Sequence, residues 1–583
     1  MTGNKVDPIT LEVLYASLPA IANDMATDIR RSSYNMMIYE VGDFVCAVLG
    51  PNGELIAQNA GGLAHFVTDL GVIIRDALDR FGAASFEPGD VVLHNHQRSG
   101  GQHLNNVCVY RPIFRADALI GFSAIRAHWV DIGGMSTGFG AQQSSVDPWL
   151  EGLQLDHIKI RQRGEVQETV FRMITDNIRM PESVIGDLRA QIAACEGAAE
   201  RFVALYDRYG AETVESTIAR IFELAEARCR RVVERLPDGV YEASSSLDLQ
   251  PGTGEVPVVH VRVTISGSDM EIDFSGSSPQ MRAPLNGRTL AGGLIAYKAI
   301  TTPAEPVNEG SFNAVRIVIP EGNVMMAKFP APMGGWSKLL PTAVETVMLA
   351  LAPAMPERIP ACHSATLGVA LVFTGVDAEG RRFVSQSIEG GGWGGRPYED
   401  GPSASVSVCQ GDVRNAPVEN LELKVPLLIE ARELVPGSGG AGKYRGGMGL
   451  RLRGRNLVDG RWLLSAGIRR TAPPWGLNGG AEGSTTRSRV QMVGDDAFSE
   501  VSNSQLLLDA AAGTRIEIQS SGGGGWGSPL DRDPELVLAD VIEGYVDIDE
   551  ARDTYGVVTD GMRIDADATR RLRKTRPEPA LTR

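Results

Sequence analysis

Clusters of glycine constrain this chain more than any other feature of its sequence. Of its 583 residues 67 are glycine, and the densest clusters lie at residues 390–395, 437–449 and 522–527. Glycine is unfavourable inside helices but permits tight turns and a close approach of backbones. The clusters are not evenly spaced copies, so they do not indicate a repeat array. We expect them to be structural, with residues 446–449 in a β-turn, and they favour β structure over a bundle of long helices.

The order of patterns along the chain predicts an α+β protein of several domains. A chain of this length exceeds what one hydrophobic core usually serves. We expect a mixed N-terminal α/β domain with a candidate metal site at 1–163, a helical segment at 164–239 and a large β-rich domain with glycine loops at 240–530. C-terminal helices are expected at 531–568, and a basic, disordered tail at 569–583.

Local signals predict individual elements within this plan. Asp7-Pro8-Ile9-Thr10 begins a helix with Thr10 as its N-cap, because apolar residues then recur every three or four positions. The turn residues Pro51-Asn52-Gly53 predict a β-hairpin between the apolar segments 43–49 and 55–57. The sequence also predicts strands at 119–127 and 258–265 and helices at 188–194, 218–236, 533–544 and 548–555.

Charge and composition exclude several classes of protein. The net charge of −16 disfavours a nucleic-acid partner, because both would be negative. No apolar run reaches the roughly 18 residues of a membrane span, and no signal peptide is visible at the start. The six cysteines form no CxxC pair, which argues against a zinc ribbon. We therefore expect a cytoplasmic protein that binds neither nucleic acid nor membrane.

Histidines concentrate in one part of the chain. Six of the eight lie between positions 65 and 157, and His94, His96, His103 and His128 have the carboxylates Asp43, Asp131 and Glu151 nearby in sequence. Neutral imidazoles and carboxylates together suit Zn, Mn or Fe. The alternative is a set of hydrogen-bonded structural histidines, and the pattern alone does not decide between the two. Arg126, two residues before His128, could stabilise an anionic intermediate or form an ion pair.

Other catalytic signatures are missing from the sequence. It contains no GxSxG nucleophile motif, no GxxxxGK[ST] phosphate loop and no strand-GxGxxG-helix fingerprint for a dinucleotide. Cys108 lies in an apolar segment and is expected to be a core residue. A nucleotide is therefore not expected on this chain.

Motifs spread over nearly the whole chain resemble those of one known family. Gly100-Gly101-Gln102-His103-Leu104 resembles GGTHLPD, residues 126–134 resemble RAHHADIGG, and residues 273–280 resemble DFSGTSPQ. Residues 7–13, 42–44, 442–447 and 522–529 match less distinctive motifs. On these motifs the chain resembles the hydantoinase B/oxoprolinase family, which includes subunits of ATP-dependent hydantoinases, caprolactamase, and acetone and acetophenone carboxylases.

The resemblance implies a set of site residues. His103 and His128 would hold a divalent metal with Asp43 as third ligand, while Asn106 stands where the family has the aspartate of GGTHLPD. His96 falls in the NDPY region of the family and could be a substitute ligand, and Trp129 replaces the second histidine of RAHH. Asp131 is expected to orient a ligand or to act as a general base, and Arg126 to be catalytic.

The resemblance also implies a function. The chain would be the metal-binding hydrolytic subunit of a two-component ATP-dependent hydrolase of cyclic amides such as hydantoins, lactams or oxoproline. A hydantoinase A-type partner would carry ATP and Mg and phosphorylate the substrate, so a hetero-oligomer is expected. The alternatives are a subunit of an acetone/acetophenone-type carboxylase, which could be structural with a degenerate metal site, and a free-standing metallohydrolase without ATP.

Overall fold

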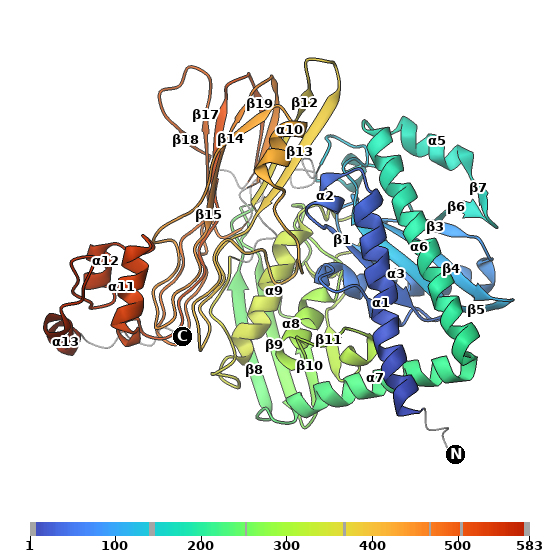
Figure 1. Cartoon of the computed structure of the whole chain (residues 1–583), viewed down its shortest axis with the longest axis horizontal. Coiled ribbons are helices and arrows are strands. Elements are labelled where there is room, and N and C mark those ends of the chain that lie inside the picture. Colours follow the sequence, from blue (N-terminus) through green and yellow to red (C-terminus); the bar gives the residue numbers. More distant parts are fainter. Residues whose placement is uncertain are drawn as a thin grey trace. The chain divides into compact units, whose positions relative to one another are not determined.

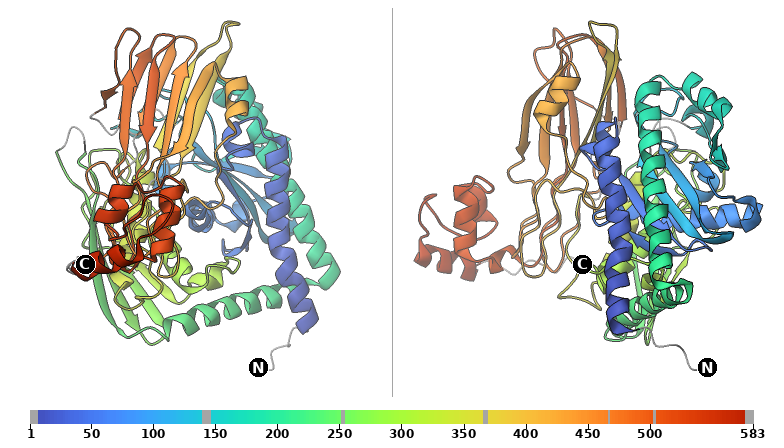
Figure 2. Two further views of the ribbon diagram at one scale, coloured as in Figure 1. Left: turned by 60° about the vertical axis from the view of Figure 1, so that its left-hand side comes forward. Right: turned by 45° about the vertical axis from the view of Figure 1, so that its right-hand side comes forward.

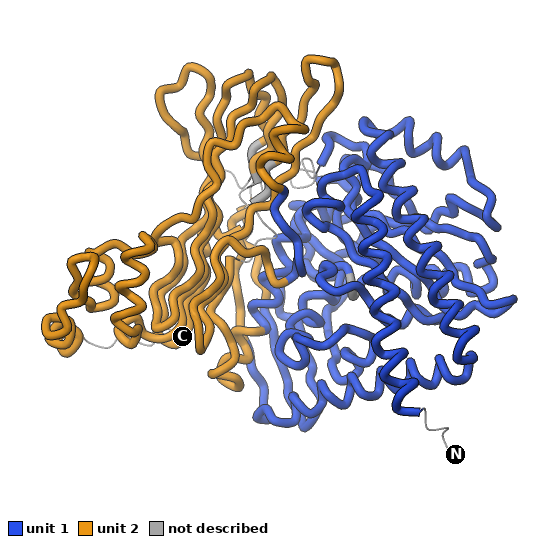
Figure 3. The backbone as a smooth tube through the Cα atoms, in the orientation of Figure 1, with its two compact units in different colours: residues 1–242, 260–347, 409–416 blue, residues 243–259, 348–408, 417–583 orange. Residues whose placement is uncertain are grey.

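A computed structural model describes residues 7–138, 146–250, 254–364, 369–465, 468–501 and 505–575. Four β-sheets combine with helices, which confirms the predicted α+β class (Figure 1). The chain forms two compact units. Unit 1 contains residues 1–242, 260–347 and 409–416, and unit 2 contains residues 243–259, 348–408 and 417–583 (Figure 3). Each unit therefore collects segments that are distant in sequence.

A seven-stranded sheet forms the centre of unit 1. Its order is β2-β1-β5-β4-β3-β6-β7, and neighbouring strands run antiparallel. The predicted hairpin is confirmed as β1 and β2, and the strand predicted at 119–127 is confirmed as β5. The strands are β1 Phe44–Leu49, β2 Leu55–Gln58, β3 Val91–His94, β4 Asn106–Arg115, β5 Ala118–His128, β6 Ile158–Gln162 and β7 Glu165–Val166.

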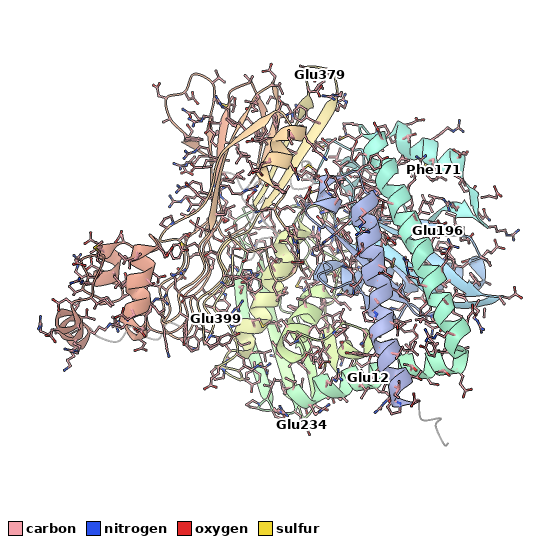
Figure 4. All side chains as sticks on the ribbon, viewed as in Figure 1. Glu12, Phe171, Glu196, Glu234, Glu379 and Glu399 are labelled. Atoms are coloured by element: carbon pink, nitrogen blue, oxygen red, sulfur yellow. The ribbon has the colours of Figure 1, made fainter. Side chains whose placement is uncertain are left out.

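Helices cover both faces of this sheet. α1 (Pro8–Ser32) and α6 (Pro181–Tyr209) run side by side (Figure 2), and Ser123 of β5 donates to the Cys195 carbonyl of α6 at 2.9 Å. At the sheet edge, Glu196 of α6, labelled in Figure 4, forms an ion pair with Arg161 at 2.6 Å. Arg126 points the other way, toward α3 (Ala64–Phe81). Alternate residues of β5 therefore face α6 and α3.

The start of α1 corrects one prediction. Asp7, and not Thr10, is the N-cap, and its carboxylate accepts a hydrogen bond from the Thr10 N–H at 2.9 Å. Pro8 lacks an N–H and suits the first turn, so the helix begins three residues earlier than a Thr10 cap would allow. The predicted apolar face is confirmed, with Leu14, Leu18, Ile21 and Met25 buried.

The rest of unit 1 is largely helical, with a second sheet of order β11-β10-β9-β8. α8 and α9 lie in the portion predicted to be β-rich. Both are buried on most sides, as expected for helices of the core and not for surface helices. The elements are α2 Met36–Tyr39, η1 Ala83–Ser85, α4 Gln97–Gly100, η2 Pro148–Leu150, α5 Glu168–Asp176, α7 Ala211–Val233, β8 Gly239–Ser246, β9 Val258–Ser266, β10 Asp269–Asp273, α8 Ala291–Thr301, η3 Glu309–Phe312, β11 Val315–Val318 and α9 Trp336–Leu351.

Unit 2 contains two further sheets, of order β13-β12-β16-β19 and β14-β15-β20-β17-β18. Among the residues described in either unit, no helix is long and apolar enough to cross a membrane. The elements of unit 2 are β12 Val369–Val376, β13 Arg382–Glu389, α10 Val418–Lys424, β14 Leu427–Leu434, β15 Leu450–Asn456, β16 Gly460–Ser465, β17 Arg487–Gln491, β18 Ser499–Glu500, β19 Gln505–Ala510, β20 Arg515–Gln519, η4 Pro529–Asp531, α11 Pro534–Ile542, α12 Ile548–Asp553 and α13 Ala566–Thr575.

The C-terminal region confirms two predictions and corrects a third. α11 and α12 are the helices expected at 533–544 and 548–555. Disorder was predicted from residue 569, but α13 continues to Thr575, so that prediction is wrong over 569–575; residues 576–583 lie outside the described residues. Arg573 anchors α13 by donating to the Arg532 and Tyr555 carbonyls at 2.8 and 3.1 Å. These tertiary bonds offset the unfavourable composition of the segment.

The glycine clusters pack against one another inside unit 2. Gly447 donates to the Trp393 carbonyl at 2.8 Å, and Gly523 donates to the Gly447 carbonyl at 2.9 Å. A Cβ added at Gly392 would lie 1.9 Å from the Gly447 carbonyl oxygen, so a side chain cannot fit there. The expected structural role is confirmed. The β-turn predicted at 446–449 is wrong, because this segment is extended and bonded to neighbouring segments.

Candidate metal centre

Strand register brings three predicted ligands into one row. Asn106, the first residue of β4, pairs with His128, the last residue of β5. The His128 N–H donates to the Asp43 carbonyl at 3.1 Å, directly before β1. Residues that lie opposite one another on antiparallel strands place their side chains on the same face. Asp43, His128 and Asn106 therefore form a row across the ends of three adjacent strands, which we call the β1–β5–β4 row.

His103 joins this row from the loop before β4. The Asn106 N–H donates to the His103 carbonyl at 3.3 Å, and the centroid of the His103 ring lies 5.1 Å from that of His128. All four residues are buried, with exposed fractions of 8% or less. Residues from three separate stretches of sequence thus meet in one place.

The electrostatics of the row suit a cation. Burial raises the pKa of Asp43 to about 7 and lowers that of His128 to about 3. Burial also holds the pKa of His103 well below its usual range, so both imidazoles are neutral. Among the described residues, Asp43 Oδ1, His103 Nδ1 and Asn106 Oδ1 are buried without a hydrogen-bond partner. A buried unsatisfied polar atom costs about 1–3 kcal/mol, which coordination of a metal would recover. These residues fit a divalent ion.

Arg126 lies on the same face of β5 as His128, two residues earlier. Its guanidinium is buried and donates to the Gly100 carbonyl at 3.0 Å and to the Asn106 carbonyl at 3.3 Å. It also pairs with Asp69 of α3 at 3.5 Å. Arg126 thus holds the loop that carries His103 against the sheet, and its catalytic role stays a prediction.

Asp131 connects the loop after β5 to the start of α6. Its carboxylate accepts hydrogen bonds from the N–H groups of Gly133 at 3.0 Å and Met180 at 3.2 Å, and also from the Arg179 N–H. The Arg179 guanidinium contributes a further bond at 3.4 Å. These bonds describe a positioning role, while action as a general base stays a prediction.

His96 and Trp129 lie outside the β1–β5–β4 row. His96 Nδ1 accepts the Arg98 N–H at 3.1 Å and caps α4, and its ring centroid is 5.0 Å from that of Phe329. A ligand role for His96 stays a prediction. The Trp129 indole donates to Gln191 of α6 at 2.8 Å, on the opposite face of the sheet from Arg126. Replacement of a histidine by Trp129 therefore takes no ligand from this row.

A second group, His94, Asp156 and His157, could also hold a metal. Among the described residues it is the one set of three or more His, Cys, Asp or Glu whose ligand atoms all lie within 4.8 Å of one another. Asp156 Oδ1 is 3.7 Å from His94 Nδ1 and 4.0 Å from His157 Nε2. The ligand atoms of Asp43, His103 and His128 are more widely spread. Sequence reasoning noted His94 but did not single out Asp156 or His157.

This His94 group has protein partners already. His157 bonds to Asp76 through Nε2 and to the Tyr110 hydroxyl through Nδ1, both at 2.9 Å. Arg80 donates to both oxygens of Asp156, at 2.8 and 3.0 Å. His94 Nε2 lies 3.0 Å from Ser99 Oγ. The group therefore forms a hydrogen-bonded, ion-paired network, in which His94 Nδ1 is buried without a hydrogen-bond partner among the described residues.

Sequence reasoning missed several residues around the β1–β5–β4 row. Gln102 accepts a hydrogen bond from Asn106 and donates one to Asp69, and Trp336 lies with its ring centroid 6.0 Å from that of His103. His65 packs against Trp336 with a centroid distance of 5.0 Å. These residues come from α3, a loop and α9, and no spacing in the sequence connects them. Only Gln102, next to His103, had a local signal.

Known proteins share this fold and sequence. A family model described as Hydantoinase B/oxoprolinase matches residues 7–529. The chain belongs to this family. It is 32% identical to the "Putative D-/L-hydantoinase" B-type subunit of Pseudomonas sp. (strain NS671), over 98% of each chain.

Two solved structures extend the comparison of this hydantoinase B/oxoprolinase family member. The ATP-dependent caprolactamase from Pseudomonas jessenii superposes with a TM-score of 0.90 at 28% identity, covering 98% of this chain and 100% of the other. A nucleotide-free acetone carboxylase gives a TM-score of 0.88 at 20% identity, covering 97% and 82%, and shows the shared fold. Relatives named as subunits of a hydantoinase, a caprolactamase and an acetophenone carboxylase show that members of the family occur in multi-subunit enzymes.

Proposed function

We propose that this chain is the metal-binding hydrolytic subunit of a two-component ATP-dependent hydrolase of cyclic amides. The observation that carries the proposal is the β1–β5–β4 row, in which Asp43 and His128 lie beside His103. Asp43 Oδ1, His103 Nδ1 and Asn106 Oδ1 are buried there without a hydrogen-bond partner among the described residues. The names of a hydantoinase subunit and an ATP-dependent caprolactamase among its relatives support a cyclic amide as substrate.

We assign metal-binding, charge-stabilising and positioning roles to the residues of this site. Asp43, His103 and His128 would hold Zn, Mn or Fe, with Asn106 as a neutral oxygen donor. A divalent ion bound there supplies Lewis-acid activation of water or of a carbonyl. Arg126, fixed by Gly100 and Asn106, would stabilise negative charge on the substrate, and Asp131 would position the loop after β5.

In this proposal, ATP is bound and used by a partner subunit of the hydantoinase A type. A cyclic amide is a poor electrophile because its nitrogen lone pair stabilises the carbonyl. Phosphorylation of the carbonyl oxygen removes this stabilisation and creates a leaving group. We expect the partner to carry ATP and Mg and to perform this step, so the chain alone would be inactive.

Reconstitution tests the proposal. The full chain would be assayed with a hydantoin, a lactam or oxoproline, with and without the hydantoinase A-type partner and ATP, and its metal content measured. We expect turnover only in the complete mixture, and loss of metal in His103→Ala and His128→Ala. Turnover without ATP would instead establish a free-standing hydrolase. ATP-dependent carboxylation of acetone or acetophenone without amide hydrolysis would establish the carboxylase alternative.

A further inference from the structure

Asn106 of the β1–β5–β4 row and two side chains next to the row form a directed chain of hydrogen bonds. Asn106 Nδ2 donates to Gln102 Oε1 at 2.7 Å, and Gln102 Nε2 donates to Asp69 Oδ2 at 2.6 Å. Resting on the proposed function, we propose that this Asp69–Gln102–Asn106 relay fixes the Asn106 amide so that Oδ1 serves as an oxygen ligand of the metal. Asp69 and Gln102 are then positioning residues.

The direction of the relay is set at Asp69. The Thr289 hydroxyl oxygen accepts the Ala291 N–H at 3.0 Å, so its proton is directed to Asp69 Oδ1 at 2.7 Å. Arg126, which can only donate, lies 3.5 Å from Asp69 Oδ2. Donors therefore surround Asp69, and it acts as an acceptor.

An acceptor at Asp69 determines both amides that follow. Gln102 must present Nε2 to Asp69, which leaves Oε1 for the next residue. Asn106 must then present Nδ2 to Gln102, so Oδ1 is turned away from the relay. Gln102 and Asn106 are 0% and 1% exposed, so water does not compete for these bonds.

The orientation of the Asn106 amide matters because Asn106 lies in the row that would bind the metal. Asn106 pairs with His128 in the β1–β5–β4 row, and its Oδ1 is buried without a hydrogen-bond partner among the described residues. A free asparagine could turn either its NH₂ or its oxygen toward the row, and only the oxygen can bind a cation. The relay fixes the amide in the metal-free protein with its oxygen directed to the row.

Zinc affinity of the full chain, measured by chelator competition, tests the relay. Gln102→Leu removes the bond to Asn106, and we expect a loss of about 10- to 100-fold in affinity, as for other residues that orient metal ligands. Asn106→Leu removes the ligand itself. In the double variant we expect no more loss than in Asn106→Leu alone, because the relay acts only through Asn106. An unchanged affinity in Gln102→Leu, or losses that multiply in the double variant, would overturn the proposal.

Two further variants test whether misfolding could explain the loss of zinc affinity in Gln102→Leu. Asp69→Asn keeps the volume but no longer imposes one direction, and we expect about a tenfold loss of zinc affinity. Asn456→Leu is the matched control in unit 2, since Asn456 is also a fully buried amide and donates to Val458 and Ala511 at 2.8 and 2.9 Å. It should lower the melting temperature and leave zinc affinity unchanged. A zinc loss in this control equal to that of Gln102→Leu would overturn the specific effect.

Failure of the proposed function would look different. If zinc affinity is unchanged in His103→Ala and His128→Ala, the metal row itself is wrong, and with it the ligand role of Asn106. The melting temperatures of the metal-free variants then test the hydrogen-bonded relay separately. If the double variant loses as many degrees as Gln102→Leu and Asn106→Leu together, the two amides do not act together. If it loses fewer degrees than that sum, they do.

Discussion

Two histidine groups in unit 1 differ in what surrounds them. His94, Asp156 and His157 are the more tightly clustered, yet both nitrogens of His157 are bonded and Arg80 occupies both oxygens of Asp156. The β1–β5–β4 row is looser, yet Asp43 Oδ1 and His103 Nδ1 lack partners among the described residues. Because His94 Nδ1 also lacks a partner among the described residues, the two groups differ chiefly in their carboxylates: both oxygens of Asp156 are occupied, whereas one oxygen of Asp43 is unsatisfied.

The two histidine groups also differ in the positive charge that surrounds their carboxylates. In the His94 group, Arg80 and Arg98 approach Asp156, and Arg80 also pairs with Asp76, so two cations already face two carboxylates. A metal there would have to displace a guanidinium. In the row, burial alone raises the pKa of Asp43, and no cation is among the causes. A divalent ion would supply that missing charge.

Removal of a histidine from each group should give the largest contrast. His103→Ala and His128→Ala should lower metal affinity by at least about a hundredfold, because each deletes a ligand and not only its support. His94→Gln should leave the metal content unchanged. Elemental analysis of the purified variants measures both. Metal that persists in the first two variants and disappears in His94→Gln would reverse the assignment of the two groups.

The pH dependence of stability should have opposite signs at the two groups. The folded chain holds the Asp43 proton up to about pH 7, while an unfolded aspartate releases it near 3.8. Stability of the metal-free chain should therefore fall as pH rises between these values. Asp43→Asn lacks this loss and should be more stable at pH 8 by more than about 1 kcal/mol, with no difference below about pH 4.

Asp156→Asn provides the matched comparison. Burial raises the pKa of Asp156, but hydrogen bonds and charge from Arg80 more than offset this, so the net shift is downward. Its carboxylate thus stabilises the fold above its ordinary pKa, and the effect is lost as pH falls through the lower folded value. The variant should be less stable by about 0.5–1 kcal/mol at pH 7, because the pair is partly exposed. Unfolding by urea across pH measures both variants, and equal signs would contradict the comparison.

His157→Phe tests whether the His94 group is structural. The phenyl ring can keep the stack on His94, whose ring centroid lies 4.1 Å away, but it loses both hydrogen bonds. The buried Tyr110 hydroxyl would then be unsatisfied, at a cost of about 1–3 kcal/mol. Stability should fall in urea unfolding while metal content stays constant. Loss of metal with unchanged stability would show that this group is the metal site.

The smallest effect is expected at Trp129. Trp129→Phe removes the 2.8 Å bond to Gln191 and should cost about 1 kcal/mol of stability. Metal affinity should change by less than about twofold, since the indole faces α6 and not the row. A thermal melt and a zinc titration of the same sample suffice. A tenfold change in affinity would place position 129 at the site after all.

Sequence patterns predicted local elements well and contacts poorly. The period of α1, the hairpin β1–β2 and the helices α11 and α12 are set by residues within a few positions of one another, and all are confirmed. α8, α9 and α13 were missed because burial and anchoring by distant residues override local composition. His103, His128 and Asp43 came from motif resemblance, and their ligand roles remain predictions.

Motifs and local periodicities in the sequence are enough to predict the family, the α+β class and the residue types available for a metal site. Tertiary structure decided which of those residues are neighbours. Antiparallel register places residues 43, 106 and 128 in one row, while packing between distant segments brings His157 to the Tyr110 hydroxyl and Asp156 to Arg80. Register depends on pairing between strands far apart in the chain, so no spacing within the sequence could have stated it.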